Sequence, residues 1–387
     1  MKLATRMGRL GTETAFEVLA KARALEAQGK EVVHLEIGEP DFDTPRNIVD
    51  AGVAALQGGW THYGPSAGLP ELRAAIAKHI SETRGVNYTA DNVVVTPGGK
   101  PIMFYVIMAM AEEGDEVIYP NPGFPIYESM INFMGAKAVP IPLREERDFC
   151  FSIDEFRSLI TPRTRLVIIN SPQNPTGSVL CKEDLQEIAR LAVKHDFWVL
   201  ADEIYGHILY EGEHHSISAF PGMPERTIIL DGFSKTYAMT GWRIGYGVMP
   251  LELVPHISRL MTNSNSCTAS FTQRAALEAL TGPQDDAYRM VAEFKRRRDV
   301  IVDGLNAIKG ITCLRPKGAF YVFPNIKGTG KTSREIADYL LYEAGVATLS
   351  GTAFGAYGEG YLRLSYANSV ENIQKALKRI EAAVARL

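Results

Sequence analysis

A lysine and an arginine stand eight residues apart after an apolar run of the chain. Lys235 closely follows Ile228–Leu230, which is typical of a strand, so we expect it at the carboxyl edge of a sheet, where open α/β sheets bind ligands. Arg243 lies among apolar neighbours, where a guanidinium needs a fixed anionic partner. A phosphate ester would serve because it accepts two parallel hydrogen bonds, and a buried carboxylate is the alternative. A lone lysine in this position would ordinarily be a solvated surface group.

Asp202 ends a second apolar run, Trp198–Leu200. A carboxylate at the end of a buried strand is costly unless it meets a cation or a hydrogen-bond donor. The protonated ring nitrogen of a ligand would supply such a donor, and the alternative is that Asp202 caps the helix that follows. Asp202 is therefore a candidate partner for a basic heterocycle.

Two turns rich in proline and glycine follow further apolar runs. Asn174 stands between two prolines, which would hold its amide rigidly for a directed hydrogen bond to a ligand. The turn Thr96–Lys100 places Gly98 and Gly99 ahead of an apolar helix, so its backbone N–H groups and the helix N-terminus could bind an anion. Either segment could instead be only a turn. The nucleotide-binding patterns GxGxxG and GxxxxGK[ST] are absent.

The combination of these groups is more informative than any one of them. One sheet edge is predicted to hold a lysine nucleophile, a buried aspartate, a rigid asparagine, an arginine and an anion-binding turn. A phosphorylated aromatic aldehyde with a basic ring nitrogen would use all five groups, and pyridoxal 5′-phosphate is such a molecule. The pattern therefore predicts a pyridoxal-phosphate site.

The elements that must position these groups alternate between short apolar strands and helical stretches. This alternation predicts an α/β fold with three layers, in which helices cover both faces of a mostly parallel sheet. The expected strands are Val93–Thr96, Glu116–Tyr119, Arg165–Asn170, Trp198–Asp202, Thr227–Leu230 and Arg243–Val248, and the expected helices include Thr14–Gln28, a helix that begins at Pro70, Ser152–Ile160 and Lys182–His195.

After residue 282 the pattern becomes that of a smaller α+β unit. The expected elements there are a helix over Asp285–Leu305, strands at Ala319–Phe323 and Tyr361–Ser365, and a helix from Val370. The basic run Lys295–Arg298 is interpreted as a solvated helix face rather than an anion site. We predict a large cofactor-binding domain over residues 46–287, and a small domain formed by residues 1–45, which include an N-terminal arm, together with residues 288–387.

Composition limits the class of protein and its surroundings. The 387 residues are 22% charged and 46% hydrophobic, with a formal net charge of −4, which argues against nucleic acid as the main partner. The longest uncharged apolar stretch, Pro101–Ala111, is about half as long as a bilayer span, and Met1–Arg6 lack the apolar core of a signal peptide. The four cysteines have neither metal-site nor disulfide spacing. We expect a soluble, cytoplasmic protein with no membrane partner and no metal.

Several motifs, in order along nearly the whole chain, resemble those of fold-type-I pyridoxal-phosphate aminotransferases of the class I/II family. The resemblance is to the branch that includes bacterial and archaeal aspartate aminotransferases, and it is specific for the family but not for one substrate. The motifs are Gly38–Pro45, Tyr63–Pro65, Asn174–Gly177, Asp202–Tyr205, Ser234–Lys235 with Arg243, Gly351–Gly355 and Arg363–Tyr366.

The resemblance implies how the cofactor is held. Lys235 would bind it covalently as the internal aldimine, and Asp202 would keep its ring nitrogen protonated. Tyr205 and Asn174 would hydrogen-bond the ring hydroxyl oxygen, and Phe124, otherwise a core phenylalanine, would stack on the ring. The residues implied to bind the phosphate are Ser234 and Arg243 together with the backbone around Gly98, Gly99 and Lys100.

The resemblance also implies a substrate site and a partner subunit. Arg363 would bind the substrate α-carboxylate, and the Gly38 backbone and Asn174 would make further contacts with it. Tyr63 matches a tyrosine that reaches the phosphate of the neighbouring subunit. A homodimer with shared active sites is therefore expected.

The implied reaction moves an amino group from an L-amino acid to a 2-oxo acid. It would be ping-pong through pyridoxamine phosphate, with Lys235 as general base and 2-oxoglutarate/glutamate as one pair of substrates. Dicarboxylate-specific relatives use a second basic residue, which neither Ile107–Ala109 nor Thr262–Asn265 supplies. With Phe16 near the substrate mouth, this slightly favours a neutral or aromatic amino acid over aspartate.

Three other functions are considered. A C–S lyase acting by β-elimination would use the same Lys235 and Asp202, and release of pyruvate and ammonia from cysteine conjugates would identify it. A ligand-sensing domain of a transcription regulator would need a DNA-binding module, but only mostly helical residues 1–37 precede Gly38. The presence of Lys235, Asp202 and Arg243 counts against a pseudoenzyme.

Overall fold

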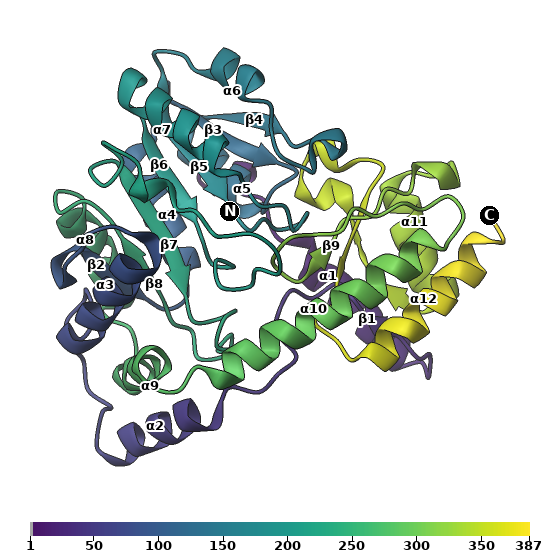
Figure 1. The fold of residues 1–387 in the computed structure, drawn as a ribbon, viewed down its shortest axis with the longest axis horizontal. Coiled ribbons are helices and arrows are strands. Elements are labelled where there is room, and N and C mark those ends of the chain that lie inside the picture. The colour runs from purple at the N-terminus through teal and green to yellow at the C-terminus, as the bar shows by residue number, and fades with distance from the viewer. Residues whose placement is uncertain (1–2) are drawn as a thin grey trace.

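A seven-stranded sheet forms the centre of the larger part of the molecule (Figure 1). The structure is a computed structural model that describes residues 3–387, so Met1 and Lys2 of the N-terminal stretch considered above lie outside the described residues. The strand order is β2-β8-β7-β6-β5-β3-β4, and all neighbours are parallel except β8, which is antiparallel to both β2 and β7. The strands are β2 (Val93–Thr96), β3 (Glu116–Asn121), β4 (Lys137–Pro142), β5 (Thr164–Asn170), β6 (Trp198–Asp202), β7 (Thr227–Gly232) and β8 (Gly245–Val248).

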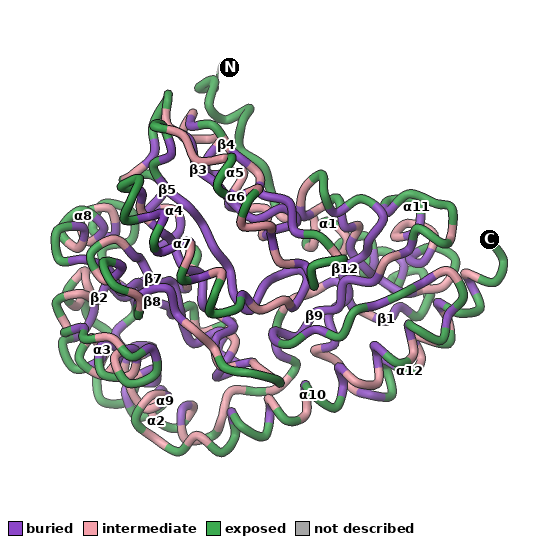
Figure 2. The backbone as a smooth tube through the Cα atoms, turned by 45° about the horizontal axis from the view of Figure 1, so that its top comes forward, coloured by how far each residue is buried: buried purple, intermediate pink, exposed green. Residues whose placement is uncertain are grey.

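Helices cover both faces of this sheet because successive strand side chains point to opposite sides. In β6, Leu200 packs in the apolar cluster of one face, whereas Val199 and Ala201 pack in a cluster of the other. Figure 2 shows the buried strands between helices whose outer surfaces are exposed. One face is covered by α4 (Lys100–Met110), α5 (Ile126–Met134) and α8 (Val254–Asn265), and the other by α3 (Pro70–Arg84), α6 (Ile153–Leu159), α7 (Lys182–His195) and α9 (Ser270–Thr281). The expected three-layer α/β fold is confirmed.

The two ends of the chain meet in smaller sheets beside this body. Parallel pairing joins β1 (Val33–His34) to β10 (Val346–Ala347), and antiparallel pairing gives the order β11-β12-β9. Helix α2 packs on α9, whereas the long helix α10 packs on α12 (Figure 1). The remaining elements are α1 (Thr14–Glu26), α2 (Arg46–Gln57), α10 (Asp285–Asn306), β9 (Tyr321–Val322), α11 (Ser333–Tyr339), a π-helical turn (Leu340–Ala344), β11 (Leu349–Ser350), β12 (Leu362–Ser365) and α12 (Val370–Val384).

Two strand predictions need correction. The strand expected over Arg243–Val248 begins only at Gly245, because Arg243 has a φ of 52° and belongs to the preceding turn. Strand β4 was not predicted, because two of its six residues are prolines, which cannot donate to a ladder. Its place at the edge of the sheet explains why it tolerates them.

The interpretation of Lys295–Arg298 as one solvated face is wrong for half of the run. Arg297 and Arg298 are buried, and their guanidinium groups form ion pairs with Asp41 and Glu211 at 2.6 and 2.8 Å. A run of charged residues does not show which of its side chains face solvent. Here Arg297 faces the N-terminal segment and Arg298 faces the loop after β6.

Two findings bear on the other compositional expectations. Within residues 3–387, no helix is both long and apolar enough to cross a membrane. Over the same residues, no three histidine, cysteine or acidic side chains gather in a way that could hold a metal ion, and the four cysteines are free.

Candidate active site

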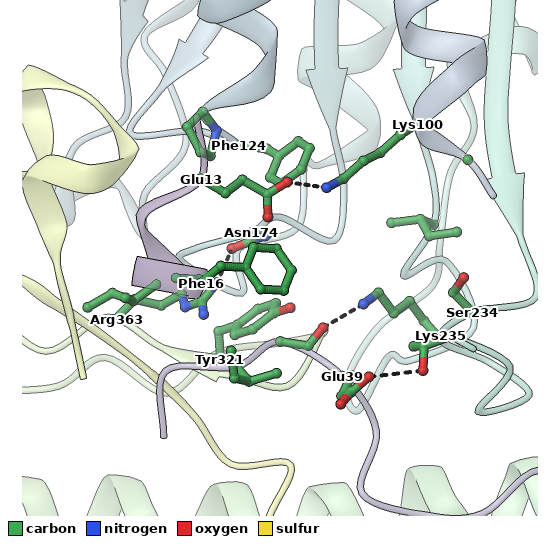
Figure 3. A pocket seen from close by; sticks show the side chains of 18 of the residues that line it. Glu13, Phe16, Glu39, Lys100, Phe124, Asn174, Ser234, Lys235, Tyr321 and Arg363 are labelled. Atoms are coloured by element: carbon green, nitrogen blue, oxygen red, sulfur yellow. Dashed lines mark hydrogen bonds and ion pairs between the residues drawn. The ribbon is translucent and has the colours of Figure 1, made fainter. Parts of the chain in front are cut away.

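A cavity of about 970 Å³ opens at the carboxyl ends of β5, β6 and β7 (Figure 3). Helix α1 and residues of β9, β12 and the loop after β11 complete its walls, so segments from both chain ends enclose it. Every candidate residue predicted from the sequence lines this cavity except Gly98 and Tyr63. Those that line it are Gly38, Gly99, Lys100, Phe124, Asn174, Asp202, Tyr205, Ser234, Lys235, Arg243 and Arg363.

Lys235 projects into the cavity from the turn after β7 (Figure 3). Its Nζ donates a hydrogen bond to the Gly38 carbonyl oxygen at 2.6 Å and lies 5.9 Å from the centre of the Tyr205 ring. Burial disfavours the charged ammonium and lowers the pKa of Lys235 to about 8. A fraction of this amine is therefore neutral near pH 7, as a nucleophile or a general base requires.

Asp202 is buried at the end of β6. Burial raises the pKa of this carboxyl to about 6, although the Tyr127 hydroxyl donates to Oδ2 at 2.5 Å and the Ile204 N–H donates to Oδ1 at 3.3 Å. Tyr127, which lies on α5 three residues after Phe124, was not predicted from the sequence. The site thus holds a carboxyl whose ionised form a cationic ligand would stabilise.

Two tyrosines line the cavity beside Lys235. The hydroxyl oxygens of Tyr205 and Tyr321 are 2.8 Å apart, and burial raises the pKa of both phenols. Tyr321 lies on β9, and nothing in its local sequence indicated that it would reach a site formed by β6 and β7. The pair places neutral phenolic hydroxyls against the space that Lys235 enters.

The turn before α4 and Arg243 together form an anion cradle. Gly98 has a φ of 93°, and a Cβ atom there would collide with Nη2 of Arg243, so the guanidinium lies directly against glycine backbone. Arg243 is exposed and donates to the Thr240 carbonyl oxygen at 2.7 Å; no acidic side chain within residues 3–387 forms an ion pair with it. The expected apolar burial of Arg243 and its alternative carboxylate partner are both wrong. A free guanidinium beside Gly99 and Ser234 fits a phosphate ester.

Arg363 supplies a second cation that lacks an acidic partner among the described residues. It is buried and lies 4.6 Å from the centre of the Tyr321 ring, and its Nη1 donates to Asn174 Oδ1 at 3.4 Å. Its Nη2 donates to the Glu36 carbonyl oxygen, whereas its buried Nε has no hydrogen-bond partner. Burial lowers the pKa of Arg363. A buried guanidinium with an unused donor fits a carboxylate ligand.

Phe124 and Tyr63 have different surroundings. Phe124 is half-buried on the cavity wall, and its ring meets that of Tyr127 edge-on at 5.6 Å. Tyr63 is 89% exposed and does not line the cavity of its own chain.

The wall of the cavity carries a pair of opposite charges that was not predicted from the sequence. The carboxylate of Glu13, immediately before α1, forms an ion pair with Nζ of Lys100 at the start of α4 (Figure 3). The sequence assigned Lys100 only to the phosphate turn, through its backbone. Its side chain also supplies a basic group to the cavity. The sequence had suggested no such group, because Ile107–Ala109 and Thr262–Asn265 contain no basic residue. Phe16 lines the mouth as expected.

A buried ionic network lies beside the site. Nε of Arg84 donates to Glu203 at 2.7 Å, and Nη2 donates to Asp231 at 3.2 Å. His214 and Ser216 also contact the Glu203 carboxylate, at 3.0 and 2.5 Å. Glu203 follows Asp202 directly, so the network fixes the backbone from which Asp202 projects.

The residues present fit pyridoxal phosphate. Gly99, Ser234 and Arg243 line the cavity, so an anion bound there would meet a guanidinium without an acidic partner among the described residues, and the cavity also offers a buried carboxyl for a basic ring nitrogen. A buried lysine with a lowered pKa is available for an aldehyde, and a second arginine is available for a carboxylate substrate.

Comparison with known proteins agrees with this chemistry. The model of the family described as "Aminotransferase class I and II" matches residues 30–380. The chain is 43% identical to an aspartate aminotransferase of Pyrococcus abyssi, over 91% of each chain, and 41% identical to aromatic-amino-acid aminotransferase 2 of Thermococcus litoralis, over 92% of each. It is also similar to the structure of an aspartate aminotransferase from Thermus thermophilus with maleate, at 41% identity and a TM-score of 0.94, covering 99% of this chain and 100% of the other.

Proposed function

Because this chain belongs to the class I and II aminotransferase family, whose members use pyridoxal phosphate, we propose that it moves an amino group from a neutral or aromatic L-amino acid to a 2-oxo acid. We propose 2-oxoglutarate and glutamate as one pair of substrates and a ping-pong order of the two half-reactions. The observation that carries this proposal is the buried amine of Lys235, with its pKa lowered to about 8, between an anion cradle and Arg363.

We assign the cofactor to the residues that line the inner cavity. Asp202 would hold the ring nitrogen, Asn174 and Tyr205 the ring hydroxyl oxygen, and Phe124 one face of the ring. Arg243 and Ser234, with the backbone of Gly98, Gly99 and Lys100, would bind the phosphate. When bound, the cofactor supplies an electron sink for a carbanion at Cα and carries the amino group between the half-reactions.

The chain's own residues would position the substrate and move its proton. Arg363 would bind the α-carboxylate through the donor that lacks a partner, with Asn174 and the Gly38 backbone beside it. That contact would hold the Cα–H bond near Lys235, whose neutral amine would take the proton as general base. Tyr127 would keep the Asp202 carboxylate oriented through its hydrogen bond.

The charges at the mouth support a neutral or aromatic donor. Lys100 is already neutralised by Glu13, and Phe16, Leu19 and Met103 add apolar surface to the same wall. Glutamate would enter in the other half-reaction by competing for Lys100. The relatives named above are aminotransferases of aspartate and of aromatic amino acids, which favours transamination over β-elimination by a C–S lyase.

We also propose a homodimer and the predicted division into residues 46–287 and residues 1–45 with 288–387. The exposure of Tyr63 supports the dimer, because an aromatic ring that is 89% exposed is free to reach a neighbouring subunit. Light scattering should give twice the chain mass of 42.6 kDa. Tyr63→Ala should weaken cofactor binding, and a monomer with unchanged affinity would contradict the proposal.

A half-reaction screen tests the function. Each amino acid is added to the purified yellow enzyme, and loss of the visible absorption band identifies amino donors. Lys235→Ala should lose at least about a hundredfold in turnover, the low end expected for loss of a general base, whereas exposed Lys309→Ala should not. Wild-type transamination by Lys235→Ala would overturn the assignment, and release of pyruvate and ammonia from cysteine conjugates would favour the lyase.

A further inference from the structure

An ion pair on the cavity wall joins two segments that are distant in the sequence. Glu13 precedes α1 and Lys100 begins α4, 87 residues later (Figure 3). The Glu13 side chain is only 17% exposed, and the Lys100 ammonium also lies 5.5 Å from the centre of the Phe124 ring. Contacts from two sides therefore hold the ammonium at the cavity wall.

The charges of Glu13 and Lys100 act on the ionisable groups of the site. The negative charge of Glu13 opposes the lowering of the pKa of both Lys235 and Arg363, and the positive charge of Lys100 adds to the lowering at Lys235. The charges of Glu13 and Lys100 would therefore also act, through Coulomb interaction, on the side chain of a substrate bound to Arg363.

The rest of the cavity lining contains both apolar and charged side chains. Phe124 lies against the Lys100 ammonium, and Phe16, Leu19 and Met103 add apolar surface to the cavity lining. Arg23, Glu26 and His34 also line the cavity, and Glu26 accepts from His34 at 3.1 Å. The Glu39 carboxylate accepts from Thr240 at 3.0 Å. The cavity thus offers a substrate side chain apolar surface and several charges, of which those of Glu13 and Lys100 are paired with each other.

We infer that Glu13 is a specificity-determining residue, which occupies Lys100 as an internal carboxylate and so weakens, without preventing, the binding of substrates that carry a second carboxylate, glutamate included. A neutral or aromatic side chain leaves the pair intact. A dicarboxylate must displace Glu13 from Lys100 and then lie beside the displaced negative charge, and close like charges are strongly unfavourable. The inference rests on the proposed function and adds its basis for discrimination.

Binding of unreactive acids to the cofactor-loaded enzyme tests the inference without depending on turnover. Succinate has two carboxylates, whereas 3-phenylpropanoate has one carboxylate and an aromatic end. In Glu13→Gln, calorimetry should give a succinate dissociation constant lower by about tenfold or more, with 3-phenylpropanoate changed by less than about threefold. Glu17→Gln removes an exposed carboxylate from α1, the helix that Glu13 precedes, and should change neither value.

Two further variants separate charge from folding and identify the cation. Glu13→Asp keeps the negative charge and should retain the wild-type preference. In Glu13→Gln/Lys100→Met the gain for succinate should vanish; a gain that survives would assign the carboxylate to Arg23 or another cation and overturn the inference. In steady state, Glu13→Gln should raise kcat/KM for aspartate relative to phenylalanine by about tenfold, mainly through a lower KM.

Unchanged or weaker succinate binding in Glu13→Gln would also overturn the inference. So would loss of turnover of lysine or ornithine with no gain for dicarboxylates, since Glu13 would then attract cationic substrates. Failure of the proposed function is a separate result, because no amino acid would then react with the wild-type enzyme in the half-reaction screen.

Discussion

Nε of Arg84 donates to Oε2 of Glu203 at 2.7 Å, and both side chains are almost completely buried. The same guanidinium reaches Asp231 at 3.2 Å. Glu203 directly follows Asp202, and Asp231 precedes Lys235 by four residues. One buried cation therefore joins the ends of the two neighbouring strands that carry the acid and the amine of the site.

Removal of this cation should destabilise the enzyme. Arg84→Met leaves two buried carboxylates without their partner, and we expect a loss of about 3–5 kcal/mol in the free energy of unfolding. The control is Arg46→Met, which breaks an ion pair whose side chains are 86% and 55% exposed and should cost less than about 1 kcal/mol. Urea denaturation measures both, and equal effects would contradict the importance of the network.

The amine of Lys235 should titrate well below an ordinary lysine. Burial lowers its pKa to about 8, so its reactivity toward an acylating reagent in the cofactor-free enzyme should rise with a midpoint near pH 8. Competitive labelling with peptide mapping by mass spectrometry resolves this residue from the surface lysines, which titrate near about 10.4. A midpoint above pH 10 for the Lys235 peptide would show that the amine is solvated.

Asp202→Asn should stabilise the cofactor-free chain while it impairs the loaded enzyme. The folded-state pKa of about 6 lies above the unfolded-state value near about 4, so the folded chain binds more protons between these values and stability falls as pH rises. At pH 8 the substitution should raise the free energy of unfolding by on the order of 2 kcal/mol, and the gain should disappear near pH 4. Urea denaturation at both pH values checks this, and a destabilised variant at pH 8 would contradict it.

Arg363→Lys should weaken the binding of every amino acid substrate. A lysine keeps the charge but loses the planar donor pair, so kcat/KM should fall by about tenfold to a thousandfold, largely through KM. Exposed Arg334→Lys is the matched control and should leave kcat/KM unchanged. Equal kinetics for the two variants would mean that Arg363 does not meet the α-carboxylate.

The sequence predicted the groups that sit at strand ends. Asp202, Asn174 and Lys235 follow apolar runs, and parallel strands bring their carboxyl ends together at one edge, so their convergence needs no detailed packing. The sheet, apart from the proline-containing edge strand β4, was predictable for the same reason.

Residues placed by helix packing were not predictable. Tyr127 and Glu13 reach the cavity because α5 and α1 lie at particular angles to the sheet, and Tyr321 reaches it because β9 folds back beside β12. Burial of Arg297 likewise depends on which side of α10 meets Asp41. Local periodicity reveals that a helix has faces, but not which distant segment covers each one.

The walls of the cavity divide cleanly along the chain. The groups assigned to the cofactor lie between Gly98 and Arg243, whereas Glu13, Phe16 and Leu19 stand on or beside one short helix near the chain start. Substitutions on this short helix would leave the sequence of the cofactor-binding strands and turns unchanged, although the charge of Glu13 also acts on Lys235. A mutant library confined to the inward face of α1 would sample new substrates without disturbing the central sheet, which makes this helix the natural starting point for engineering the enzyme.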